Sequence, residues 1–282
     1  MYSDILLTVD YDRTLTGPDA KVPPRNLEAI RYFMDHGGTF TVNTGRSIPM
    51  IQNLKKQVPV NAPLLLYNGS AAYDLRTESM LFCHEIQDDP WEIAAVCAKA
   101  FPDLTFEVQG LDAHYRFAEN PMWDALSDNN GCARAFAEPG HIFKPFLKFS
   151  FYGEIRSKEI SSMFEGTEEE LQRMTQAENL LREMYGDRME IFRAAARIID
   201  VHAKGVSKMR SARELKEKLG KKILVCAGDG ENDVSMLDGA DYAFCPGDAV
   251  VKDRYPNVCK CGDGAVADVI YRELPQIISE KA

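Results

Sequence analysis

Residues Ile5–Asp19 read ILLTVDYDRTLTGPD, and the interpretation of the whole chain begins at this stretch. An apolar run, Ile5–Val9, is followed directly by two acids, Asp10 and Asp12. The run is too short for a helix and rich in Leu, Ile and Val, which is typical of a strand buried on both faces of a parallel sheet. The question that this stretch raises is what role two carboxylates have at the end of a buried strand.

Three further apolar runs have the same character, and they lie at residues 39–42, 63–67 and 223–227. Helical patterns separate the runs: one covers residues 24–36, and Ser207 is expected to cap another that ends at Gly220. Ser47 is likewise expected to cap a helix that has Pro49 in its first turn. Strands that alternate with helices in this way predict an α/β fold, a Rossmann-like parallel sheet with helices on both faces.

The stretch from residue 82 to residue 201 follows a different pattern, with short alternating segments between helices. Its longest helix is expected to follow a capping box formed by Thr167 and Glu170. The parallel-sheet pattern resumes after this stretch. We therefore expect two domains, a core made of residues 1–81 and 202–282 and a smaller α+β cap domain of residues 82–201 inserted into it.

Small and polar residues follow each of the four apolar runs. These strand ends are residues 10–14, 43–46, 68–70 and 228–233. In open α/β sheets ligands bind outside the carboxyl ends of the strands. The four segments are therefore expected to converge on one site, although they lie far apart in the sequence.

The acids at these strand ends predict a metal site. Asp10, Asp12, Asp229 and Asp233 would bring several carboxylates into one crevice, where like charges cannot all stay ionised without compensation. A hard divalent cation supplies that compensation, and a set of oxygen ligands with waters suits Mg²⁺.

Other residues at the same ends are suited to holding a phosphoryl group. Thr44 and the amide that follows it can bind phosphate oxygens, and so can the Asn232 amide. Lys208 stands at the start of the helix capped by Ser207, where the helix N-terminus and an ammonium both attract an anion. A metal, a hydroxyl, amides and a lysine together fit phosphoryl transfer, in which catalysis is mostly positioning and charge stabilisation.

Four short motifs carry a resemblance to a known family. "DYDRT", "NTGRS", "GVSK" and "GDGENDVSML" resemble, in the same order, the four motifs of the haloacid dehalogenase-like phosphatase superfamily. The insert lies between the second and third motifs, as in the Cof-type branch, whose members are mostly sugar-phosphate and related phosphatases. The resemblance covers the whole chain, and it implies an enzyme that hydrolyses phosphoric monoesters.

The resemblance also implies roles for individual residues. Asp10 would attack phosphorus and become an aspartyl-phosphate, and Asp12 would act as acid to the leaving oxygen and then as base to water. Mg²⁺ would be held by Asp10, the backbone carbonyl of Asp12, and Asp229. Supporting roles fall to Thr14 in the first loop and to Asp233, while the phosphoryl group would be held by Thr44, Gly45, Lys208 and Asn232. The insert would be the cap that selects the substrate.

Arg13 departs from this resemblance, because the family usually has glycine at that position. Glycine lets backbone approach phosphate closely and adopts unusual dihedral angles at no cost. The arginine side chain is expected either to point toward the cap and contact substrate or to lie outside on the surface. We expect Arg13→Gly to preserve turnover and to alter substrate preference.

Composition limits the partners and the compartment. The chain has 282 residues and a formal net charge of -10, which argues against a general nucleic-acid binder but not against a small phosphorylated substrate. No apolar run approaches the roughly 20 residues that span a bilayer, and no secretory signal is recognisable. The seven cysteines are scattered, as expected of free thiols in a reducing cytoplasm. The sequence carries no signal for an oligomeric state.

The function predicted from the sequence is therefore a magnesium-dependent phosphatase that acts on a small phosphorylated metabolite, such as a sugar phosphate. One alternative is a sugar phosphomutase with the same aspartyl-phosphate chemistry. Another is a low-turnover phospho-acceptor or binding module, against which the large cap and the second acid argue. A dinucleotide oxidoreductase is not favoured, because no G-x-G-x-x-G follows the first strand.

Overall fold

The computed structural model describes residues 1–119, 132–153 and 165–281. The chain divides into two compact units. The core unit comprises Met1–Gly45, Leu54–Phe82 and Ser207–Ala282, and the insert unit comprises Arg46–Asn53 and Cys83–Val206. Each unit has its own hydrophobic cluster, so each is described by itself.

A five-stranded parallel sheet forms the centre of the core unit. Its strands, in the order β14-β13-β12-β1-β2, are Asn257–Val258, Tyr242–Pro246, Ile223–Ala227, Ile5–Val9 and Thr39–Val42. Every residue of β1 is buried, because parallel neighbours flank the strand and helices cover both faces of the sheet. The predicted α/β class is confirmed, and β13 is a strand that the search for apolar runs did not find.

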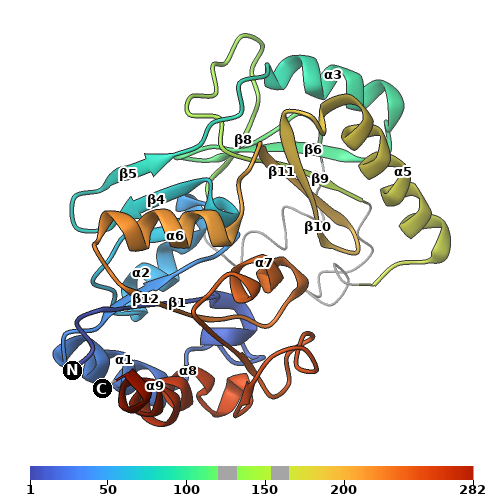
Figure 1. Ribbon diagram of the computed structural model, residues 1–282. Coiled ribbons are helices and arrows are strands. Elements are labelled where there is room, and N and C mark those ends of the chain that lie inside the picture. The colour runs from blue at the N-terminus through green and yellow to red at the C-terminus, as the bar shows by residue number, and fades with distance from the viewer. Residues whose placement is uncertain (120–131, 154–164, 282) are drawn as a thin grey trace. The chain divides into compact units, whose positions relative to one another are not determined.

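The helices of the core unit lie on both faces of this sheet, with α6 and α7 on one face and α1, α8 and α9 on the other (Figure 1). Their bounds are Pro24–Asp35 for α1, Gln52–Gln57 for the short α2, Lys208–Lys218 for α6, Val234–Asp238 for α7, Ala265–Asp268 for α8 and Leu274–Lys281 for α9. Ser207 caps α6 as predicted, since its Oγ accepts from the Arg210 amide at 3.1 Å. Gly220 follows the helix with a φ of +64°.

The third apolar run is not a member of the parallel sheet, so that part of the prediction was wrong. Strand β3, Leu64–Leu66, pairs antiparallel with β4, Ala71–Asp74, in a small sheet completed by β5, Ser79–Cys83. The chain reverses directly after β3, because Tyr67, Asn68 and Gly69 all have positive φ angles. An isolated parallel bridge between Asn43 and Leu65 still joins β3 to the end of β2.

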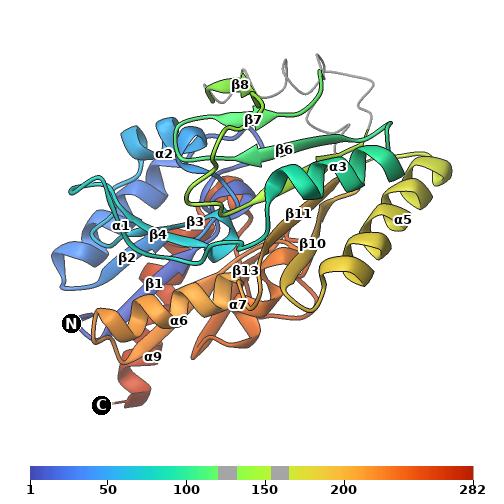
Figure 2. The same ribbon diagram turned by 90° about the horizontal axis from the view of Figure 1, so that it is seen from above.

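The insert unit is built on a six-stranded mixed sheet. Its strands, in the order β10-β11-β9-β6-β7-β8, are Met189–Ala195, Ile198–Ala203, Phe149–Tyr152, Thr105–Gln109, His114–Arg116 and Arg134–Phe136. Helices α3, Pro90–Ala100, and α5, Glu168–Tyr185, pack against one face of the sheet (Figure 2). The capping box of α5 is present as predicted, with both hydrogen bonds between Thr167 and Glu170. No helix among the described residues has the length and apolar character needed to cross a bilayer.

The two faces of the insert sheet differ in chemistry, because successive side chains of a strand point to opposite faces. One face carries Phe106, Phe149, Phe151, Ile199 and Val201, which pack against α3 and α5 in the apolar cluster of this unit. The residues between them are polar and equally buried, and they are Glu107, Gln109, Ser150, Tyr152, Asp200 and His202. The insert unit therefore buries a polar layer as well as an apolar one.

Candidate active site

A buried ion-pair cluster lies at the carboxyl end of β1. Asp10 directly follows the strand, and its Oδ1 accepts a hydrogen bond from the Lys208 ammonium at 2.5 Å. The same Nζ donates to Oδ1 of Asp233 at 2.6 Å. All three side chains are buried, and Lys208 is the first residue of α6. The structure thus places residues from three distant parts of the chain around one ammonium group.

Asp229 joins this cluster from the end of β12. Its Oδ1 accepts from the Thr14 hydroxyl at 3.2 Å, and its backbone amide donates to Oδ2 of Asp233 at 3.0 Å. The Gly230 amide also donates to that oxygen at 3.0 Å. Both side-chain oxygens of Asp233 therefore accept hydrogen bonds from the protein, three in all. Asp10 and Asp229 each accept fewer hydrogen bonds.

Burial controls the protonation of the cluster. The pKa of Asp10 is raised well above its usual range, first by burial and then by the negative charges of Asp233, Asp229 and Asp12, with Lys208 opposing. Burial acts to lower the pKa of Lys208, but Asp10 and Asp233 outweigh that effect and raise it. Lys208 therefore stays charged, and one ammonium does not balance the carboxylates that surround it.

Asp229 shows the same excess of negative charge. Its pKa is raised to about 6, first by burial and then by the charge of Asp233, while Lys208, the Thr14 hydrogen bond and Arg13 oppose the shift. A second cation would remove this excess. Ligand oxygens of Asp10, Asp229 and Asp233 all lie within 4.8 Å of one another, and this is the one such group of acids found among the described residues. The donor set is oxygen only, which fits a hard cation such as Mg²⁺.

The end of β2 brings the second motif beside the cluster. Val42 pairs in register with Val9, so Asn43 and Thr44 lie at the level of the residues that follow β1. The Asn43 side chain donates to the carbonyl of Lys208 at 2.8 Å and so fixes the start of α6. Sequence reasoning did not assign a role to Asn43, although it lies in the quoted "NTGRS" stretch.

Close backbone approaches hold the loops at this end. Thr44 is buried, its amide donates to the Leu65 carbonyl at 2.9 Å, and its carbonyl accepts from the Asn68 amide at 3.0 Å. A Cβ on Gly45 would lie 2.8 Å from the Asn68 side chain, and one on Gly69 would lie 2.4 Å from the Ser207 carbonyl. Glycine at position 69 therefore allows the β3 turn to touch the N-terminus of α6.

Two predicted residues lie outside the buried cluster. Asp12 is exposed and belongs to a wide turn, Tyr11–Leu15, in which the Leu15 amide returns to the Asp10 carbonyl at 3.2 Å. Asn232 is also exposed, in the short helical turn Glu231–Asp233. Both side chains are therefore accessible to solvent, unlike the three acids of the buried cluster.

Arg13 is exposed on the surface of its unit, which is one of the two positions expected for it. Its backbone has a left-handed conformation with a φ of 61°, and its amide donates to Oγ1 of Thr16 at 3.1 Å. Its Nε lies 3.9 Å from Oδ2 of Asp229, and 57% of the side chain is exposed. The guanidinium therefore faces the acidic cluster of its own unit.

The polar layer of the insert sheet forms a second buried network. Ser47 Oγ lies 2.6 Å from Nε2 of His114, whose Nδ1 lies 2.9 Å from Glu107. The expectation that the Ser47 side chain caps a helix was therefore wrong, because the turn Ile48–Ile51 that follows has no such bond. Its hydroxyl instead bonds a side chain 67 positions further along the chain.

The same network continues across the sheet to a buried ion pair. Ser150 donates to Oδ1 of Asp200 at 2.6 Å, and the Lys148 ammonium lies 2.6 Å from the other oxygen of that carboxylate. Burial and the charge of Lys148 lower the pKa of nearby His202 to about 3. Here the Lys148 ammonium pairs with the Asp200 carboxylate, and the neighbouring imidazole is held neutral.

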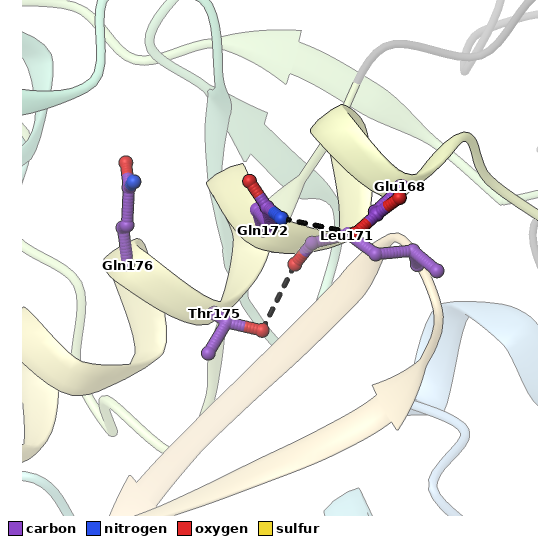
Figure 3. Close-up of a pocket in the computed structure, with 5 residues that line it drawn as sticks. All are labelled: Glu168, Leu171, Gln172, Thr175 and Gln176. Carbon is purple, nitrogen blue, oxygen red and sulfur yellow. Dashed lines mark hydrogen bonds between the residues drawn. The ribbon is translucent and has the colours of Figure 1, made fainter.

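A shallow hollow on α5 is a separate surface feature of the insert unit (Figure 3). It is lined by Glu168, Leu171, Gln172, Thr175 and Gln176. The polar groups drawn there bond along their own helix, with Thr175 Oγ1 donating to the Leu171 carbonyl at 2.9 Å and Gln172 to Glu168 at 3.4 Å. The hollow offers no buried charge, so it is not a candidate for the chemistry.

Comparisons with known proteins identify the family of the chain. A family model of haloacid dehalogenase-like hydrolases matches residues 7–270. An HMP-PP phosphatase of Serratia proteamaculans is 24% identical over 283 residues, which cover 95% of each chain. An HMP-PP phosphatase of Escherichia coli O6:H1 is 22% identical over 286 residues, covering 96% of this chain and 97% of the relative.

Solved structures share the fold over nearly the full length. A haloacid dehalogenase-like hydrolase from Bacteroides thetaiotaomicron superposes with a TM-score of 0.80 at 20% identity, covering 97% of this chain and all of that one. One from B. subtilis superposes with a TM-score of 0.76 at 16% identity, covering 95% and 99%.

The match over residues 7–270 establishes the class: the chain belongs to the haloacid dehalogenase-like hydrolases. Within that class it is an enzyme of the Cof-type phosphatase group, as its four motifs predicted.

Proposed function

We propose that the protein is a magnesium-dependent phosphatase that hydrolyses a small phosphorylated metabolite through an aspartyl-phosphate on Asp10. The observation that carries the proposal is the buried cluster in which Asp10, Asp229 and Asp233 surround a single ammonium from Lys208. The carboxylates of this cluster outnumber its ammonium group, so one more cation would balance their charge. The Asp10 carboxylate also lies at the carboxyl ends of the strands, where ligands bind in this type of sheet. The names of the phosphatase relatives agree with this reaction class.

The first chemical step would be attack by the Asp10 carboxylate on phosphorus. A bond forms between the Asp10 oxygen and phosphorus while the ester bond to the organic group breaks. The Asp12 carboxyl gives its proton to the departing oxygen, which leaves as an alcohol. Lys208, held by Asp10 and Asp233, places its positive charge where the phosphoryl oxygens gather.

The second step would release inorganic phosphate. Asp12, now a carboxylate, takes a proton from a water molecule whose oxygen attacks phosphorus, and the bond between phosphorus and Asp10 breaks. Asp12 ends protonated and Asp10 ends as a carboxylate, so the enzyme returns to its starting state. Because Asp12 is exposed on its turn, it can meet both the leaving group and water.

Magnesium would be held by Asp10, Asp229 and the backbone carbonyl of Asp12, with Asp233 supporting through its bonds to Lys208 and to the amides of residues 229 and 230. When bound, it supplies the positive charge that keeps these carboxylates ionised and neutralises phosphoryl oxygens. Thr44, Gly45 and Asn232 would contact the remaining phosphoryl oxygens.

A panel of phosphomonoesters, including sugar phosphates, tests the proposal by release of inorganic phosphate with and without Mg²⁺. We expect turnover that needs the metal and falls at least ~1,000-fold in Asp10→Asn, because a nucleophile is removed without loss of shape. Asp35→Asn, an exposed acid at the end of α1, is the matched control and should retain turnover.

Several results would contradict the proposal. Turnover that survives in Asp10→Asn would remove the nucleophile assigned here. Isomerisation of a phosphosugar that needs a bisphosphate activator, with little phosphate released, would identify a mutase. Phosphorylation of Asp10 without turnover would identify a phospho-acceptor module.

A further inference from the structure

Arg13 is a charged residue of the first motif to which the proposed reaction assigns no role. Its backbone is held in a left-handed conformation, and its amide bonds the Thr16 hydroxyl at 3.1 Å. Residues other than glycine adopt this conformation at a cost of roughly 1 kcal/mol or more, so the arginine is retained there against a local preference. Strained backbone of this kind clusters at functional sites, which makes the contacts of the arginine side chain the next observation to consider.

The contacts of the side chain indicate what that use is. Arg13 Nε lies 3.9 Å from Oδ2 of Asp229, while Oδ1 of Asp229 accepts the Thr14 hydroxyl. The positive charge thus stands beside a carboxylate that the proposed function assigns to magnesium. Lys208 is already committed to Asp10 and Asp233, so Arg13 is the cation that faces the remaining acid of the cluster.

A cation in that position has an unavoidable effect on metal binding. It stabilises the ionised Asp229 when the metal is absent, and it repels a dication that approaches the same carboxylate. Both effects lower the affinity for the metal. Because more than half of the side chain is exposed, solvent weakens the repulsion without removing it.

We propose that Arg13 is a built-in counter-ion to Asp229 that competes with Mg²⁺ and sets a weak, readily exchanged metal affinity. This inference rests on the proposed function, since it takes Asp229 as a metal ligand. Under this inference the main effect of substituting Arg13 is on the affinity for Mg²⁺, and not on substrate preference as the sequence had led us to expect.

Titration calorimetry of the full-length protein with MgCl₂, without substrate, tests the inference through three variants. Arg13→Gln removes the charge and keeps a side chain, Arg13→Gly removes the charge and the strain, and Arg13→Lys keeps the charge. We expect Arg13→Gln and Arg13→Gly to bind Mg²⁺ roughly three- to tenfold more tightly than wild type at low salt, and Arg13→Lys to remain close to wild type.

Repeating the titrations at high salt distinguishes an electrostatic effect of Arg13 on Mg²⁺ affinity from an effect of backbone strain. At about 1 M monovalent salt the Debye length falls to about 3 Å, so the gain in affinity should shrink toward wild type. A gain that persists in high salt, or that appears in Arg13→Gly and not in Arg13→Gln, would assign the effect to backbone strain and overturn the inference.

The inference and the proposed function fail in different ways. Three results together would show that the counter-ion role alone is wrong. They are that wild type binds Mg²⁺, that Asp229→Asn does not bind it, and that Arg13→Gln binds it with the affinity of wild type. If neither wild type nor Arg13→Gln binds Mg²⁺, the metal site itself is refuted, and the inference is refuted with it.

Discussion

The core unit and the insert unit each bury a lysine among carboxylates, and the two clusters differ in charge balance. In the core unit, Lys208 is shared between Asp10 and Asp233 with Asp229 nearby, so acids outnumber the buried ammonium. In the insert unit, Lys148 lies 2.6 Å from Asp200. The other buried acid of the network, Glu107, lies 2.9 Å from Nδ1 of His114, and His202 is neutral. An unbalanced cluster is a site for a cation, whereas a balanced one is complete by itself.

Removing each lysine in turn tests the difference in charge balance between the two clusters. We expect Lys208→Met and Lys148→Met each to lower the free energy of unfolding by about 3–5 kcal/mol, because each leaves a buried carboxylate without its partner. Saturating Mg²⁺ should stabilise Lys208→Met more than wild type and should not restore Lys148→Met. Urea unfolding of wild type and the two variants, each with and without Mg²⁺, measures all six values.

Lys204→Met serves as the control, because Lys204 is exposed in the insert unit. Its stability should stay within about 1 kcal/mol of wild type. Equal stabilisation of Lys208→Met and Lys148→Met by Mg²⁺ would show that charge balance does not distinguish the clusters.

The two clusters should also respond to acid in opposite directions. His202 has a folded pKa near 3 against an ordinary value of 6.5, so its contribution is complete above pH 6.5 and is lost as the pH falls. Asp229 has a folded pKa near 6 against 3.8, so its contribution is complete below pH 3.8 and is lost as the pH rises through 6. Between pH 6.5 and 4 each effect amounts to about 2–3 kcal/mol, with opposite sign.

Local probes can separate these effects. Trp91 lies in α3 and packs against the apolar cluster of the insert unit, so its fluorescence should report the loss of stability in acid, and His202→Gln should flatten that loss. Amide exchange in β1 of metal-free protein should slow between pH 6 and 4 after correction for the intrinsic rate. Mg²⁺ should abolish that change, and acid sensitivity of the same sign in both units would contradict the assignment.

The sequence was sufficient to predict those elements whose pattern is local. Ile5–Val9, Thr39–Val42 and Ile223–Ala227 are strands with the expected bounds, because each is a compact apolar run that ends in polar residues. Strand β13, YAFCP, was missed because it contains none of the Leu, Ile and Val residues that marked the other runs, and because it ends in proline. The pairing of β3 was predicted wrongly because it depends on positive φ angles at Tyr67 and Asn68, residues that are not glycine.

The residues of the site also fall into two groups, those whose position could be predicted from the sequence and those whose position could not. The assembly of Asp10, Asp229 and Asp233 follows from the rule that parallel strands end at one edge of a sheet, and Lys208 joins them from the N-terminus of α6. The direction of the Arg13 side chain and the Ser47–His114 bond depend on tertiary contacts. No local pattern in the sequence encodes those contacts.

The most direct test of the account is to trap the phosphoryl group on the enzyme. Asp12→Asn protein is mixed with Mg²⁺ and p-nitrophenyl phosphate, whose leaving group needs no acid, then quenched in acid and analysed by peptide mass spectrometry. We predict one phosphoryl group on Asp10, accumulated because the base for the second step is gone. Steady turnover with no phosphoryl group on Asp10, or with the group on another residue, would contradict the account.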